Sequence, residues 1–139
     1  MNINKYNPAD GYDVVTHEAL TKLVLEEKTG YMPLVYICSP FAGNEVGNMK
    51  KARVYSRFAF MNHCIPITPH IYFPQFCDEA TGREKVMFMN MVLLAKCQEI
   101  WVFGDVITKG MQVEIDKATE RKSTKVRYFT TELVEKNHD

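Results

Sequence analysis

The stretch Trp101–Ala118, WVFGDVITKGMQVEIDKA, changes its pattern in the middle. Its first part is a continuous apolar run that ends at Gly104 and Asp105, and such a run is typical of a strand buried on both faces of a parallel sheet. Its second part begins around Thr108 and Gly110 and has the spacing of an amphipathic helix. A buried strand followed by a helix predicts a βα unit.

The same alternation continues on both sides of this unit. Strand patterns occur at 33–40, 64–70 and 125–129, and helix patterns occur at 44–63 and 83–97. The aromatic segment 71–82 predicts a loop, and segment 130–139 predicts a short terminal helix. We therefore expect an α/β domain of the flavodoxin-like or Rossmann-like type, with three layers and a parallel sheet of about four or five strands.

Length, charge and cysteine content narrow the class of protein. We expect one α/β domain at 31–139, preceded by an irregular arm and a helix at 1–30. Lys and Arg number 17, as do Asp and Glu, so no excess charge favours a nucleic acid polymer or an anionic membrane. No signal peptide pattern or membrane-length apolar run occurs, which predicts a cytoplasmic protein. The four cysteines form no C-x-x-C pair, so we expect buried reduced thiols and neither a metal nor a cofactor.

Small and polar residues stand at or just beyond the carboxyl end of each of the first three strand patterns. They are Ser39, Pro40 and Gly43 for the first strand, His70 for the second, and Asp105, Thr108 and Gly110 for the third. The carboxyl ends of parallel strands meet at one edge of a sheet, and ligands bind beyond that edge where the strand order reverses. The sequence therefore predicts a binding site there.

Glu114 is the strongest candidate for chemistry at this site. If its helix begins near Lys109 or Gly110, Glu114 lies in the first turn, where the helix dipole favours the ionised carboxylate by about 0.3–1 kcal/mol. Thr108 supplies a capping hydroxyl, and Gly110 lets a ligand approach a helix end that binds anions. The alternative is an ordinary solvated acid of an amphipathic helix.

The spacing Thr108-x-Gly110-x-x-x-Glu114 resembles the catalytic signature of the nucleoside 2-deoxyribosyltransferase-like superfamily, in which the glutamate attacks the anomeric carbon. The strand VYICSPF resembles the first strand of that superfamily, whose tyrosine, here Tyr36, positions the glutamate. The chain is more similar still to a branch of the superfamily from bacteria and phages. That branch has the same four stretches in the same order: YICSPFAGN, NMKKARVYSRFA, TPHIYFPQF and IWVFGDVITKGMQVEI. The resemblance spans about 33–129. It implies cleavage of the N-glycosidic bond of a nucleoside or nucleotide, or deoxyribosyl transfer.

The resemblance also implies roles for individual residues. Glu114 is the expected nucleophile, and Tyr36 orients it. From its place at the end of the third predicted strand, Asp105 is expected to contact ribose hydroxyls or to act as a second acid–base group, with a turn residue after Gly104 as the alternative. The residues expected to bind the substrate are Ser39, Pro40, Phe41, Gly43, His70, Thr108, Gly110 and Met111. His70 titrates near pH 6.5 in its ordinary state, so it is expected to bind phosphate or carry a proton, with a purely structural role as the alternative.

Two departures from the superfamily leave other functions open. Gln98 and Glu99 stand where an aspartate near the nucleobase is usual, and the loop 41–44 lacks the arginine that binds a 5′-phosphate. A non-catalytic nucleotide-binding protein that uses the same cleft is the first alternative, and a structural module whose Glu114 only caps a helix is the second. The methionine-rich run MFMNMVLL indicates core or a subunit contact, and we expect a homo-oligomer.

Overall fold

The computed structural model describes residues 17, 19–20 and 30–137, with the backbone alone for residues 79–81. The chain divides into two units, Met1–Met32 and Pro33–Asp139. The arm and helix predicted for 1–30 lie almost entirely outside the described residues. None of the helices in the described part of the chain combines the length and hydropathy that a membrane crossing requires.

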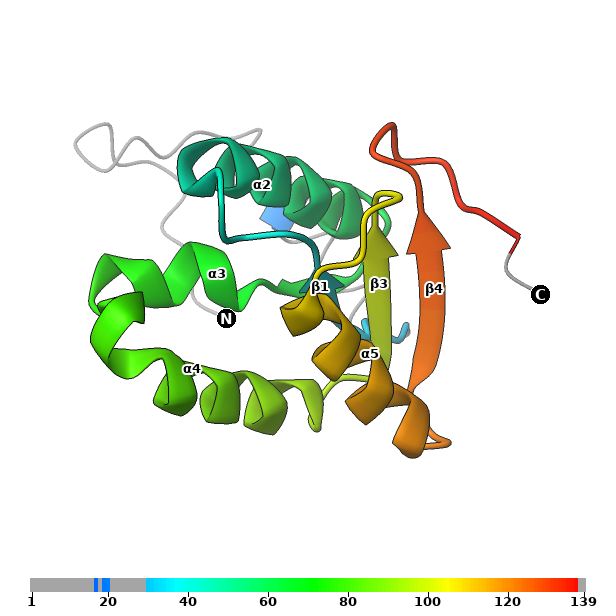
Figure 1. Cartoon of the computed structure of the whole chain (residues 1–139). Coiled ribbons are helices and arrows are strands. Elements are labelled where there is room, and N and C mark those ends of the chain that lie inside the picture. Colours follow the sequence, from blue (N-terminus) through cyan, green and yellow to red (C-terminus); the bar gives the residue numbers. More distant parts are fainter. Residues whose placement is uncertain (1–16, 18, 21–29, 138–139) are drawn as a thin grey trace. The chain divides into compact units, whose positions relative to one another are not determined.

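A parallel sheet of four strands forms the centre of the second unit, which confirms the predicted fold class (Figure 1). The strands are β1 (Leu34–Cys38), β2 (Ile65–Ile67), β3 (Glu99–Phe103) and β4 (Lys125–Phe129), in the spatial order β2-β1-β3-β4. β1 and β3 occupy the middle and are buried along nearly their whole length. Their continuous apolar sequences follow from this position, because both faces of a central parallel strand are covered.

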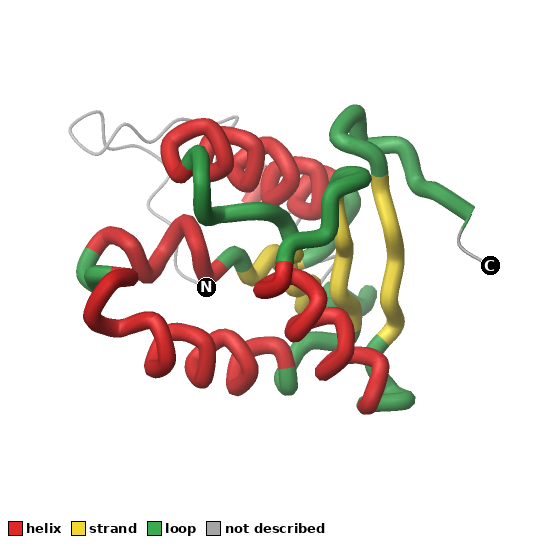
Figure 2. The backbone as a smooth tube through the Cα atoms, in the orientation of Figure 1, coloured by secondary structure: helices red, strands yellow, loops and turns green. Residues whose placement is uncertain are grey.

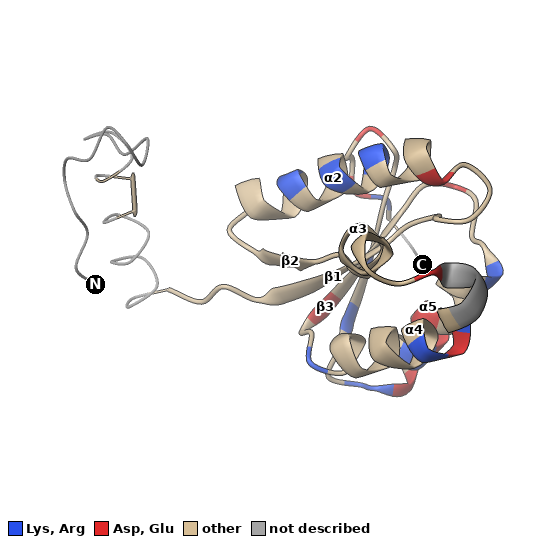
Figure 3. Cartoon of the chain, turned by 90° about the vertical axis from the view of Figure 1, so that its left-hand side faces the viewer, with Lys and Arg blue, Asp and Glu red and all other residues tan. Residues whose placement is uncertain are grey.

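Helices cover both faces of the sheet and make three layers (Figure 3). α2 (Glu45–Met61) lies on one face, where Ala52, Tyr55 and Ala59 pack on the sheet, and basic residues follow its outer side. α4 (Glu79–Leu94) and α5 (Lys109–Glu120) lie on the other face. The two cores therefore share no side chains, since alternate residues of β1 and β3 point to opposite faces.

The strand order reverses between β1 and β3, because the chain leaves β1 for β2 on one side and later adds β3 on the other. The loops that follow these strands separate at that point (Figure 2). The Oγ atoms of Ser56 and Thr68 lie 2.6 Å apart and join α2 to the residue after β2. This contact fixes the start of the next segment, which carries His70.

Three local predictions are wrong. The strand predicted at 64–70 ends early, because Pro69 starts the helical turn α3 (Pro69–Tyr72). The loop predicted at 71–82 continues this turn into the 3-10 helix η2 (Phe73–Gln75), where aromatic rings of the segment contact one another. The described part of the predicted terminal helix forms a turn and an antiparallel bridge between Phe129 and Glu135. Leu133 has φ 70° there, a conformation that a right-handed helix excludes.

Candidate functional site

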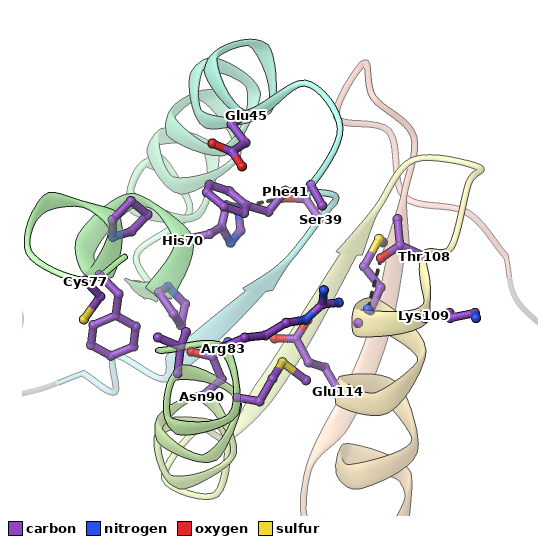
Figure 4. A pocket seen from close by; sticks show the side chains of 18 of the residues that line it. Ser39, Phe41, Glu45, His70, Cys77, Arg83, Asn90, Thr108, Lys109 and Glu114 are labelled. Carbon is purple, nitrogen blue, oxygen red and sulfur yellow. Dashed lines mark hydrogen bonds between the residues drawn. The ribbon is translucent and has the colours of Figure 1, made fainter. Parts of the chain in front are cut away.

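A cavity of about 830 Å³ lies beyond the carboxyl ends of β1, β2 and β3 (Figure 4). Its walls come from the loop after β1, from α3 and η2, from α4 and from the first turns of α5. This is the place that the strand order predicts, and the size is within the range of small-molecule sites. Ser39, Phe41, His70, Thr108, Gly110, Met111 and Glu114 are the sequence-predicted residues that line it.

Glu114 is held at the cavity by residues from the central strand. The Tyr36 hydroxyl donates a hydrogen bond to Oε2 of Glu114. The Cys38 thiol lies 3.6 Å from Oε1 of the same carboxyl group. Tyr36 and Cys38 are two residues apart on β1, so both side chains point to the α5 face of the sheet. The arrangement places the carboxyl group at the wall of the cavity and fixes its orientation.

The expectation that the helix dipole keeps Glu114 ionised is wrong in its physical basis. α5 begins at Lys109, so Glu114 lies in the second turn of the helix, where the dipole effect has declined. Burial raises the pKa of Glu114 to about 7, although the hydrogen bonds from Tyr36 and Cys38 act in the opposite direction. Glu114 is therefore not a solvated surface acid, and its carboxyl group binds a proton more tightly than that of an exposed glutamate.

Ser39 and His70 form a second polar pair in the cavity. The Ser39 Oγ and His70 Nε2 atoms lie 3.0 Å apart, and the ring of Phe41 is 5.9 Å from the imidazole ring, centroid to centroid. Burial lowers the pKa of His70 from 6.5 to about 4. The expected titration of His70 near pH 6.5 is therefore wrong. At neutral pH the ring has no charge to offer a phosphate, but it can accept or donate one hydrogen bond.

Thr108 has the capping role that the sequence predicts. Its Oγ1 accepts a hydrogen bond from the backbone N–H of Met111 at 3.2 Å, which closes the first turn of α5. An added Cβ on Gly110 would meet only Thr108 Oγ1, at 4.0 Å, so the glycine leaves this end of the helix open to a ligand. The side chain of Lys109 points away from the centre of the cavity (Figure 4).

Four of the predicted residues do not line the cavity, and one of them, Tyr36, is buried behind its wall. Asp105 is exposed, and its carboxylate is 2.8 Å from Lys136 Nζ in the C-terminal tail. The hydrogen bond from Lys136 lowers the pKa of Asp105. Pro40 and Gly43 belong to the loop after β1 but are not among the lining residues, and Gly43 serves as a turn residue with φ 99°. Asp105 therefore lies where it stabilises the tail.

Residues of α4 and the start of α2 also line the cavity, and none of them is among the substrate-binding residues predicted above. They are Glu45, Arg83, Val86, Met87 and Asn90. Arg83 points from α4 into the cavity (Figure 4). One signal was available in the sequence: Asn90 is a lone polar residue inside the apolar run MFMNMVLL. Such a residue on the buried side of a helix needs a hydrogen-bond partner or a ligand.

The cysteines and histidines do not gather into a metal site in the described residues, where no group of three or more potential ligands occurs. Cys38, Cys64 and Cys97 are buried free thiols, as predicted. Cys77 is half-buried and lines the cavity. Burial raises the pKa of Cys97 to about 12, so this thiol stays protonated.

A protein family model described as Domain of unknown function (DUF7768) matches residues 33–129. The chain belongs to this family. The match begins just before β1 and ends with the last residue of β4, so the family domain contains every element that lines the cavity. No match is found among the curated proteins.

Proposed function

We propose that the protein cleaves the N-glycosidic bond of a nucleoside or nucleotide, by hydrolysis or by deoxyribosyl transfer, with Glu114 as the nucleophile. The observation that carries the proposal is the carboxyl group of Glu114 at the cavity wall, oriented by the Tyr36 hydroxyl. The same two residues match the nucleophile and its tyrosine in the resemblance to the nucleoside 2-deoxyribosyltransferase-like superfamily. Geometry and resemblance thus support the same pair.

The surroundings of Glu114 suit the charge that develops in this reaction. Breaking the bond between the anomeric carbon and the base creates positive charge on the sugar, and an anion stabilises that charge most where water is excluded. The raised pKa of Glu114 reflects burial without an ion-paired cation among the described residues. The ionised form is therefore destabilised in the resting protein and gains most as the sugar becomes cationic.

The reaction then proceeds in two balanced steps. A carboxylate oxygen of Glu114 forms a bond to the anomeric carbon while the C–N bond breaks, and the base leaves with the electron pair and takes up a proton. Water or a second base next attacks the anomeric carbon, releases the carboxylate and gives up a proton. Solvent supplies the proton that the leaving base takes up and accepts the proton released in the second step, because His70, with a pKa of about 4, is a weak base and serves as a hydrogen-bonding group beside Ser39.

Base release from a panel of 2′-deoxynucleosides and their 5′-monophosphates tests the proposal. We expect the wild-type protein to release base and Glu114→Gln to be slower by roughly 10³-fold or more, because the amide cannot attack. Asp116→Asn is the matched control, since this exposed acid of α5 bonds Gln112 and does not line the cavity. Equal rates for wild type and Glu114→Gln would contradict the proposed nucleophile.

A non-catalytic nucleotide-binding protein is the second candidate, and two observations favour it. Burial raises the pKa of Glu114 to about 7, which reduces the amount of ionised nucleophile at neutral pH, and Asp105, the expected second acid–base group, is paired with Lys136 away from the cavity. This candidate predicts that nucleosides or nucleotides bind with the same affinity to wild type and Glu114→Gln at low pH, with no base release by either. Calorimetric titration beside the release assay separates the two functions.

A further inference from the structure

Asn90 carries a buried hydrogen-bond acceptor without a partner. Its Oδ1 atom is shielded from solvent and makes no hydrogen bond to any residue that the structure describes. The residue lies in the α4 wall of the cavity, together with Val86 and Met87. These positions are separated by three and four residues, so all three occupy the same side of the helix.

An orphaned acceptor of this kind requires an explanation. Most buried polar side-chain atoms in proteins are hydrogen-bonded, because an unpaired one loses its hydration without compensation. Leucine or methionine would fill the same place on α4 with no such loss, as they do in the rest of the run MFMNMVLL. A ligand in the cavity that donates an N–H group would supply the missing partner once the amide turns toward it, because Oδ1 is shielded from solvent in the ligand-free protein.

We propose that Asn90 recognises an N–H donor on the edge of the ligand's base, and that it determines which bases the cavity accepts. This inference rests on the proposed function, because it takes the ligand to be a nucleoside or nucleotide. Glu114 on α5 and Asn90 on α4 lie on different walls of the cavity (Figure 4). A sugar at Glu114 therefore leaves its base to extend toward α4.

The amide is chemically suited to this task. It presents an acceptor beside a donor, and the pair matches an amino group next to a ring nitrogen, as on adenine. The terminal torsion of asparagine turns easily, so the bound base decides which end faces it. The neighbours Val86 and Met87 supply the apolar surface against which a base packs.

The experiment measures binding with two ligands that differ only in the donor: 2′-deoxyadenosine and purine 2′-deoxyriboside, which lacks the amino group. Titrations use the Glu114→Gln protein, so that turnover does not disturb them. We expect Asn90→Leu to lower the affinity for 2′-deoxyadenosine roughly 10- to 100-fold, and the affinity for purine 2′-deoxyriboside by less than about threefold. Asn90→Asp retains an acceptor, so its affinity for 2′-deoxyadenosine is expected to fall less than that of Asn90→Leu.

The pyrimidine pair 2′-deoxyuridine and N3-methyl-2′-deoxyuridine tests a ring N–H donor in the same way. Asn137→Leu, an exposed position in the C-terminal tail outside the cavity, is the matched control for the substitution. An equal loss of affinity for both members of every pair, or no loss at all, would overturn the assignment.

The ligand-free stability gives an independent check. Replacing an unpaired acceptor by an apolar side chain of similar shape is neutral or stabilising, so Asn90→Leu is expected to melt at the wild-type temperature or above. A clearly lower melting temperature would show that Asn90 has a partner within the protein and would overturn the inference. Binding without base release contradicts only the catalytic proposal, whereas failure of all the nucleosides to bind contradicts both.

Discussion

The two faces of the sheet differ in whether their charged groups have ion-pair partners. On the α2 side, Arg127 lies over the rings of Trp101 and Phe129, 4.9 and 5.3 Å from their centroids, and it forms ion pairs with Glu99 and Glu135. On the α4–α5 side, Glu114 is buried and has no ion-paired cation among the described residues.

The difference separates a structural cluster from the proposed functional site. Each charge around Arg127 has a partner, so the cluster holds β3, β4 and the tail together at low electrostatic cost. Glu114 has a raised pKa instead of an ion-pair partner, and this reduces the stability of the folded protein at neutral pH. Destabilising arrangements of this kind are typical of sites that are selected for chemistry or binding.

The largest effect is expected for Glu114→Gln at high pH. The folded pKa of about 7 exceeds the ordinary value of 4.5, so the folded state keeps a proton that the unfolded state has already released between these values. The free energy of unfolding of the wild type therefore falls as the pH rises through this window, by roughly 2–3 kcal/mol, because the side chain keeps some exposure. The free energy of unfolding of Glu114→Gln is expected to show no such decrease, because glutamine does not titrate.

Urea unfolding of both proteins at pH 4 and pH 8 measures this difference. Groups that titrate in both proteins cancel in the comparison. Parallel stability profiles would show that Glu114 is not the buried, unpaired acid that distinguishes its face of the sheet.

Arg127→Met is expected to lower the free energy of unfolding by about 1–2 kcal/mol at pH 7. Methionine keeps the packing of the aliphatic stem but removes the cation over the rings and leaves Glu99 without its ion pair. Lys117→Met is the matched control, because the pair of Lys117 with Glu120 is exposed at 4.0 Å and contributes little. If both variants are equally stable, the Arg127 cluster has no structural role.

Tyr36→Phe is expected to raise the pKa of Glu114 by about 0.7 unit, equivalent to about 1 kcal/mol for one lost hydrogen bond. The sign follows because the Tyr36 hydroxyl donates to the carboxylate and so favours the ionised form. A carboxyl ¹³C NMR titration of glutamate-labelled protein, with Glu114→Gln to assign the signal, measures the change. The control Tyr55→Phe, on the α2 face, should leave the titration midpoint of Glu114 unchanged.

The central strands, the position of the cavity and the helix cap could be predicted from the sequence, because each depends on neighbouring residues. The unbroken apolar runs of β1 and β3 identify central parallel strands, and the residues after them locate the cavity at the point where the strand order reverses. The Thr108 cap follows from the residue type and its place before the helix. Each of these features depends on a few neighbouring residues.

The electrostatic state of the two acids was not accessible, because it depends on distant segments. Glu114 is buried by residues of β1 and α4, which the periodicity of α5 does not reveal. Asp105 is paired with Lys136 only because the tail turns back at Leu133 toward β4 instead of forming the predicted helix. Side chains of identical chemistry thus acquire opposite pKa shifts from contacts far away in the chain.

Asp105→Asn is expected to have the smallest effect and completes the comparison of the two acids. Its carboxylate is exposed and bonded to Lys136 outside the cavity, so base release and nucleoside affinity should change less than about twofold. Lys136→Met should behave in the same way, because it removes the other member of the pair. A loss in the release assay for Asp105→Asn as large as that for Glu114→Gln would show that Asp105 leaves Lys136 and enters the cavity when a substrate binds. The two acids would then form one catalytic pair, and the distinction between a structural and a functional carboxylate would hold only for the ligand-free protein.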